Sequence, residues 1–210
     1  MRTARIEEID PIRVVGGALQ WRPVRRTLGV QAFGINAYTA DRDELVIEEH
    51  DETGAGAGHH EELYIVVSGR ATFTVDGESF DAPAGTLVFL DDPKERRGAR
   101  AIEDRTSVLA IGGVRGQAFR VSPWEFAFAS VPAVEAGRYD KAKALLVQGL
   151  EAHPDNTSLL YDLACVEALM GDRDAALDHL ETAVSDPRLR EHAQKDSDLD
   201  SIRDDPRFPR

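Results

Sequence analysis

Adjacent histidines and glutamates, His59, His60, Glu61 and Glu62, are the residues in this sequence that best suit metal or acid–base chemistry. Imidazole nitrogens and carboxylate oxygens are common ligands of Zn²⁺ and Fe²⁺. Side chains alternate along a strand, so residues at even distances from Glu62 share its face. We therefore expect His60 and Tyr64 to point inward with Glu62, and His59 to point away.

His50 lies at an even distance from Glu62, but the glycine-rich segment 54–58 separates the two residues. The alternation of side chains along a strand therefore does not show whether His50 points to the same side as Glu62. With His60 and Glu62 it would form a poor, open site for Zn, Fe, Mn or Ni. The other interpretation is that the two adjacent histidines are ordinary loop residues. The small number of donors favours this second interpretation, and we predict that no metal or other cofactor is bound.

No other catalytic centre is indicated, because the sequence has no Ser-His-Asp signature, phosphate loop or CxxC pair. Cys165 is the single cysteine and lies among apolar residues, where a small core residue is expected. It cannot form an internal disulfide, which is typical of a cytoplasmic protein. The sequence leaves open whether the protein is an enzyme, and its residues favour a non-catalytic role.

The elements that must position these residues are short strands separated by tight turns, up to about Gly113. The expected strands are 30–38, 45–49, 63–67, 71–75, 86–90 and 106–111. Asp76-Gly77 favours the turn of a two-residue hairpin. The continuous apolar run 63–67 suits a strand covered on both faces. Many short strands with regular turns predict an all-β sandwich or barrel.

After Pro123 the apolar residues recur at helical spacing, and alanine and leucine become frequent. The segment 137–140 is matched by 171–174, at a shift of 34 residues. This period, with small residues where helices cross, resembles the tetratricopeptide repeat over about 126–188. Pro132 departs from the pattern inside the first helix. Two repeats are fewer than the roughly three needed for independent stability, so we expect the helices to pack on the barrel or on a second subunit.

The strand region resembles the cupin family. Residues 58–69 are similar to the first cupin motif, in which a glutamate precedes a glycine, here Glu62 and Gly69. Residues 81–90 are similar to the second motif, and the resemblance covers about 44–112. It implies a fold of β + α class, with an N-terminal jelly-roll barrel followed by a small all-α tetratricopeptide-like domain.

The resemblance also implies a metal held by three histidines and one glutamate, but only Glu62 matches this set. The two neighbouring histidine positions fall on Gly56 and Gly58, and the last falls near Arg96. A lone buried carboxylate needs another cation. Arg96, or Arg97 if the register shifts, is expected to supply it as a bidentate pair. The alternative is that these arginines belong to a solvated charged loop.

The resemblance places a ligand-binding site inside the barrel. The predicted lining is His60, Glu62, Tyr64, Phe73, Phe89 and Arg96. For Phe73 and Phe89, simple core packing is the favoured alternative, and Trp21 and Trp124 are expected to be packing anchors. The expected parts of the chain are an N-terminal extension on the barrel (1–28), the cupin barrel (29–115), a linker (116–123), and the helical module with its C-terminal tail (124–210).

The formal net charge of -13 makes the chain acidic, which argues against a nucleic-acid partner. No apolar run suits a membrane span or a secretory leader. The sequence therefore predicts a cytoplasmic, homodimeric protein that binds an unidentified small molecule and contacts a protein through its helices. The alternatives are a metal-dependent dioxygenase or isomerase that uses His60 and Glu62, and a structural dimerisation module.

Overall fold

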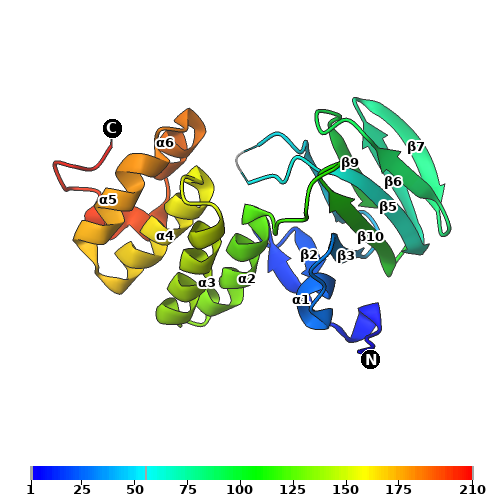
Figure 1. The fold of residues 1–210 in the computed structure, drawn as a ribbon, viewed down its shortest axis with the longest axis horizontal. Helices are drawn as coiled ribbons and strands as arrows, with labels where there is room; N and C mark the ends of the chain where they lie inside the picture. The colour runs from blue at the N-terminus through cyan, green and yellow to red at the C-terminus, as the bar shows by residue number, and fades with distance from the viewer. Residues whose placement is uncertain (1, 55, 210) are drawn as a thin grey trace. The chain divides into compact units, whose positions relative to one another are not determined.

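The computed structural model describes residues 2–54 and 56–209. The chain forms two compact units, one ending at Val121 and the other beginning at Ser122 (Figure 1). This division falls inside the segment 116–123 in which the sequence predicts a linker. The first unit is built of strands and the second of helices, so the structure confirms the β + α class.

The first unit consists of two antiparallel sheets. The larger has the order β1 (Ile12–Val14), β2 (Leu19–Arg22), β3 (Gly34–Ala40), β10 (Thr106–Gly113), β5 (Glu61–Ser68) and β8 (Leu87–Leu90). The smaller has the order β4 (Leu45–His50), β9 (Arg97–Ala101), β6 (Arg70–Val75) and β7 (Glu78–Pro83). Buried side chains of both sheets share one core. Two antiparallel sheets around one core form the jelly-roll barrel that the sequence predicts.

The strands differ from the prediction mainly at β1, β2, β7 and β9, which the expected set does not contain. Residues 1–28 are not merely an extension, because β2 pairs with β3 and adds β1 to the sheet. A 3₁₀ turn, η1 (Ile6–Glu8), and the short helix α1 (Val24–Leu28) complete this segment. The predicted hairpin turn is confirmed, since Asp76 and Gly77 both have positive φ, 48° and 86°.

The second unit contains α2 (Pro123–Glu135), α3 (Tyr139–Ala152), α4 (Thr157–Met170), α5 (Arg173–Ala183), α6 (Pro187–Ala193) and a 3₁₀ helix, η2 (Ser197–Ile202). Each of the helices α2, α3 and α4 packs on the one that follows it. Gly137 and Gly171 have left-handed φ of 64° and 81°, which permits the tight turns between helices. At Gly149 a Cβ would lie 2.9 Å from Leu159 and 3.0 Å from Phe126, so the small residue permits close approach.

The C-terminal segment covers one side of the helical array. Leu199, Ile202 and Phe208 are at most 4% exposed and belong to the same core as Leu177 and Leu180 of α5. The chain therefore supplies its own cover for at least part of the apolar surface that two repeats leave open. No helix in the described residues is long and apolar enough to cross a membrane.

Candidate functional site

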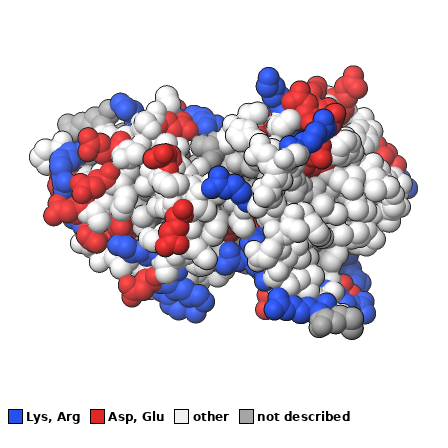
Figure 2. All heavy atoms as spheres, in the orientation of Figure 1, with Lys and Arg blue, Asp and Glu red and all other residues white. Residues whose placement is uncertain are grey.

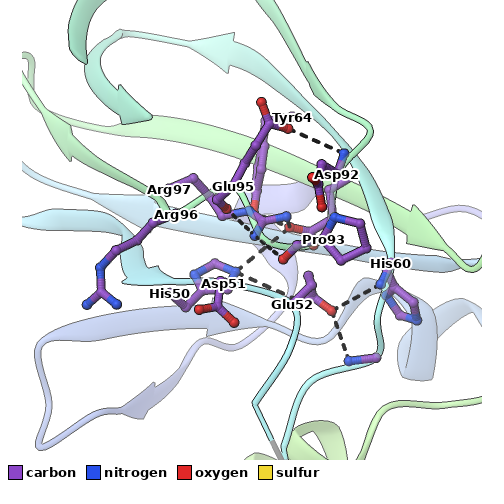
Figure 3. Close-up of polar contacts among 12 residues, drawn as sticks. His50, Asp51, Glu52, His60, Tyr64, Asp92, Pro93, Glu95, Arg96 and Arg97 are labelled. Carbon is purple, nitrogen blue, oxygen red and sulfur yellow. Dashed lines mark hydrogen bonds and ion pairs between the residues drawn. The ribbon is translucent and has the colours of Figure 1, made fainter. Parts of the chain in front are cut away.

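The side chains of His50, Glu52 and Arg97, labelled in Figure 3, lie close to that of Glu62. Glu62 lies on the inner face of β5, Arg97 begins β9, His50 ends β4, and Glu52 follows in the next loop. Arg97 is fully buried, and the side chains of Glu52 and Glu62 are 5% and 11% exposed. The site thus places two carboxylates and one guanidinium where water has little access, next to the more exposed imidazole of His50.

One oxygen of Glu62 is the focus of the cluster. Tyr64 donates its hydroxyl proton to Oε2, and Arg97 Nη2 lies 3.4 Å from the same atom. Burial alone would raise the pKa of Glu62, but His50, the Tyr64 hydroxyl and Arg97 outweigh it and hold the pKa below its usual range. Burial and the Glu62 charge raise the pKa of Tyr64 well above its usual value. Tyr64 therefore remains a donor, and Glu62 remains charged.

His50 lies between the two carboxylates. Its Nδ1 is 2.7 Å from the carbonyl oxygen of Glu48, so Nδ1 must carry a proton. Its Nε2 lies 3.8 Å from Glu52 Oε1 and 3.8 Å from Glu62 Oε2. Burial opposes protonation, but the attraction of Glu62, the Glu48 carbonyl and Glu52 prevails and raises the pKa of His50. When Nε2 is protonated, the imidazolium bridges both acids.

Glu52 is a site residue that the sequence analysis did not identify. Its Oε2 accepts hydrogen bonds from the backbone N–H groups of Gly58, at 2.9 Å, and His60, at 3.4 Å. The carboxylate therefore ties the loop before β5 to the barrel end. The only signal in the sequence is its even spacing from His50 and Glu62, and that signal is weak in a loop.

The structure places His50 in the polar cluster and His60 outside it. His60 is 7% exposed, as an inward position requires, but its ring lies against Phe119, with centroids 6.0 Å apart. Among the described residues, the group whose ligand atoms converge is His50, Glu52 and Glu62, within 4.8 Å of one another. The alternative metal set of His60, Glu62 and His50 is therefore corrected, with Glu52 in place of His60. His59 is exposed, as predicted.

Two predicted lining residues lie outside the barrel. Phe89 is 58% exposed, because the inner positions of β8 are Val88 and Leu90. The Arg96 side chain is 58% exposed and pairs with Glu49 at 2.5 Å. The proposed Glu62–Arg96 pair is therefore wrong. The alternative, Arg97, provides the buried cation, through one nitrogen rather than a bidentate fork.

The remaining aromatic residues fill the interior. Tyr64 and Phe73 are 1% and 0% exposed, and their ring centroids lie 5.7 Å apart. Trp21 is fully buried, as expected of a packing anchor. Tyr64 and Phe73 belong to the core that the two sheets share.

The residues present do not fit the metal that the fold family implies. Arg97 is a fixed positive charge 3.4 Å from the best ligand oxygen, and it would repel a divalent ion. Glu52 Oε2 is already occupied by backbone donors. Gly56 and Gly58, at the positions of two expected histidines, offer no side-chain ligand. His50, Glu52 and Glu62 alone make an incomplete set.

Comparison with known proteins supports the two-part organisation. The family model described as Tetratricopeptide repeat matches residues 133–195, which lie in the helical unit. This confirms the resemblance inferred from the 34-residue period. A comparison with curated proteins gives no match.

Solved structures similar to this chain include cupin and double-stranded β-helix proteins. A cupin protein from Bacteroides fragilis has 21% identity, with 50% of this chain and 83% of that chain covered and a TM-score of 0.39. A double-stranded β-helix protein from Klebsiella pneumoniae has 17% identity, with 58% and 97% covered and a TM-score of 0.43. A Cupin 2 conserved barrel domain protein from Salinispora arenicola has 19% identity, with 55% and 90% covered and a TM-score of 0.42. These likenesses concern the fold and carry no argument about activity.

Proposed function

We propose that this protein binds a small polar molecule at the end of its cupin-type barrel without a metal, and that its helical module contacts a protein partner. The observation that carries the proposal is the buried guanidinium of Arg97 beside Glu62. A buried carboxylate requires a compensating positive charge. Arg97 supplies it permanently, because a guanidinium stays protonated in proteins.

The charge balance supports a site that functions without a metal. Glu52 and Glu62 contribute two negative charges, and Arg97 and protonated His50 contribute two positive charges. The cluster is then neutral, and a divalent cation would leave a surplus of positive charge in a buried place. When His50 loses its proton, the cluster carries one net negative charge. Uptake of a proton makes the cluster neutral again, whereas a divalent cation would leave one net positive charge.

The position of the polar groups supports a ligand site at the barrel end and a neutral, polar ligand. The His50 side chain is 33% exposed and is the most accessible member of the cluster. Tyr64 and Phe73 fill the deeper interior, so the ligand meets the barrel end. An anion would face two carboxylates, and a cation would face Arg97. A neutral molecule that carries hydroxyl groups can both donate to Glu62 and accept from His50.

Elemental analysis of protein purified without chelator tests the absence of metal. We expect Zn, Fe, Mn and Ni far below one atom per chain, with no difference between wild type and Glu62→Gln. Thermal-shift measurements with neutral polyols and sugars then test the ligand class. The shift should disappear in His50→Gln and persist in Arg96→Gln, a control at an exposed arginine outside the barrel. A shift seen only with anionic compounds would contradict the proposed chemistry.

A second candidate is a metal-dependent enzyme, and the convergence of His50, Glu52 and Glu62 within 4.8 Å favours it. Near-stoichiometric metal that disappears in both Glu52→Gln and Glu62→Gln would establish this alternative.

Two further parts of the proposal concern the helical module and the location of the protein. The helical module is expected to contact protein because it matches the repeat model. The free thiol of Cys165 supports a cytoplasmic location.

A further inference from the structure

Two glycines leave the inner face of the larger sheet without side chains next to the polar cluster. The strand pairing aligns Gly34 of β3 and Gly112 of β10 in one row with Glu62 of β5. A Cβ at Gly34 would lie 3.1 Å from the ring of Phe119. A Cβ at Gly112 would lie 3.2 Å from Nδ1 of His60. The absence of two side chains in this row therefore makes room for two rings.

Phe119 belongs to the segment that leaves the barrel after β10, residues 114–121, which we call the strap. The strap turns at Gly116, whose φ of 74° is left-handed. After this turn the half-buried ring of Phe119 lies against the imidazole of His60, with ring centroids 6.0 Å apart. The strap ends where the helical unit begins, at Ser122 (Figure 1).

A surface ion pair holds the beginning of the strap. Arg115 donates from Nε and Nη2 to one oxygen of Glu61, at 3.1 and 2.9 Å, and lies 3.8 Å from Asp91. In the view of Figure 2, acidic and basic side chains of the strand unit similarly lie next to one another at its rim. The Arg115 side chain is 70% exposed, so solvent screens this pair and it contributes little. Among the described contacts, the ring of Phe119 is therefore the main attachment of the strap.

His60 connects the strap to the polar cluster. Its ring contacts Phe119, and its backbone N–H donates to Oε2 of Glu52 at 3.4 Å. A Cβ at Gly112 would lie 3.2 Å from His60 and 3.3 Å from Cγ of Glu62, so these two side chains pack on the same glycine. A displacement of either carboxylate therefore moves the His60 ring, on which Phe119 rests.

We propose that the strap is a closing element of the barrel end and that Glu52 controls it. While Glu52 holds the His60 amide, the ring of Phe119 stays in the room that the two glycines leave. An event that breaks this hydrogen bond, such as a ligand that engages the Glu52 carboxylate, releases the ring and the strap. Because the helical unit follows the strap directly, release lengthens the free connection between the two units. The regulatory use of this release rests on the proposed ligand site, whereas the coupling is a property of the ligand-free chain.

Backbone ¹⁵N relaxation of the full chain without ligand measures the order of the strap residue by residue. The order parameters of residues 115–120 are expected to be about 0.8 in the wild type and to fall below about 0.6 in Phe119→Ala. Gly34→Val fills the same room from the opposite side and should release the strap to the same extent. Phe80→Ala removes another partly exposed ring, and Gly113→Val adds a side chain where a Cβ meets nothing within 4 Å. These two variants are matched controls and should leave the strap unchanged.

The control by Glu52 is tested with substitutions outside the strap. Glu52→Ala should lower the order parameters of residues 115–120 below about 0.6, as Phe119→Ala does. Glu49→Ala removes an exposed carboxylate of β4 and should have no effect on the strap. Coupling is reciprocal, so Phe119→Ala should accelerate hydrogen exchange of the His60 amide by roughly tenfold. If Glu52→Ala does not fold, this exchange measurement decides the coupling.

Order parameters of the strap below about 0.6 in the wild type would overturn the proposal. So would a wild-type value in Phe119→Ala, or release of the strap in either control. An unchanged strap in a folded Glu52→Ala variant, or unchanged exchange at His60 in Phe119→Ala, would overturn the control by Glu52. All these measurements use protein without ligand, so their failure is separate from a failure of the thermal-shift test with polyols and sugars.

Discussion

Replacing Arg97 with methionine tests the central feature of the site, because it removes the cation and keeps most of the side-chain volume. The Nη2 atom lies 3.4 Å from Glu62 Oε2, and the side chain is fully buried. At an effective dielectric constant of about 20, two unit charges at this separation attract by about 5 kcal/mol. Breaking a buried pair by removing one partner typically costs about 3 to 5 kcal/mol. We therefore expect Arg97→Met to lower the free energy of unfolding of the barrel by about 3 to 5 kcal/mol.

Urea unfolding followed by tryptophan fluorescence measures this loss. The chain has two tryptophans, so a Trp124→Phe background leaves Trp21 as the reporter of the barrel. Arg96→Met is the matched control. That neighbouring guanidinium is exposed and pairs with Glu49, so no measurable change is expected.

A double-mutant cycle separates the pair from other effects of the substitution. Glu62→Gln alone leaves Arg97 buried without its charged partner, and the double variant leaves neither charge. The combined loss should be smaller than the sum of the two single losses by at least 1 kcal/mol. A loss below about 1 kcal/mol for Arg97→Met, or strict additivity in the cycle, would refute the idea that the arginine replaces a metal as the counter-charge of the glutamate.

Three further outcomes follow from the described contacts. The pKa of Glu62 is lowered, so its stabilising effect is present above the ordinary carboxyl pKa and is lost as the pH falls through the lowered value. The pKa of His50 is raised, so its stabilising effect is present below about pH 6.5 and is lost as the pH rises through the raised value. The urea midpoint of the barrel should therefore be highest between about pH 5 and 6.5, and His50→Gln should remove the loss on the alkaline side. Phe208→Ala should lower the stability of the helical unit by about 3 kcal/mol in thermal unfolding, because the ring is 4% exposed in the core of α4 and α5. Glu167→Gln should cost about 2 kcal/mol in the same assay, because this buried carboxylate pairs with Lys143 at 2.9 Å, and a cost near zero would show that the pair is dispensable.

Most of the fold could be predicted because several local signals agree. The alternation in 71–75, the Asp76-Gly77 turn and the 34-residue period each reflect a backbone requirement that short segments reveal. Strand β9 could not be predicted in the same way. Its sequence, Arg97 to Ala101, has no apolar alternation, since its inner positions are one arginine and two alanines. Small residues suit the crowded interior, but they give no periodic signal.

The candidate site was harder to predict because it depends on register. A shift of one residue moves every side chain of a strand to the opposite face. The choice between Arg96 and Arg97 is such a shift, and the loop before β9 gives no means of fixing it from sequence. Glu52 presents the same difficulty, because its role depends on the backbone N–H groups of the folded loop. Side-chain types alone cannot predict these contacts.

The apolar run of β5 connects the sequence pattern to the packing on the two faces of the larger sheet. A strand in which Leu63, Ile65 and Val67 face one way, and Tyr64 and Val66 the other, requires a cover on both sides. The barrel core covers the inner side completely, as the 1% and 0% exposures of Tyr64 and Val66 show. The N-terminal segment covers the outer side only as far as β10. The run therefore predicts more apolar surface on β5 than the barrel core and the N-terminal segment cover within the described residues.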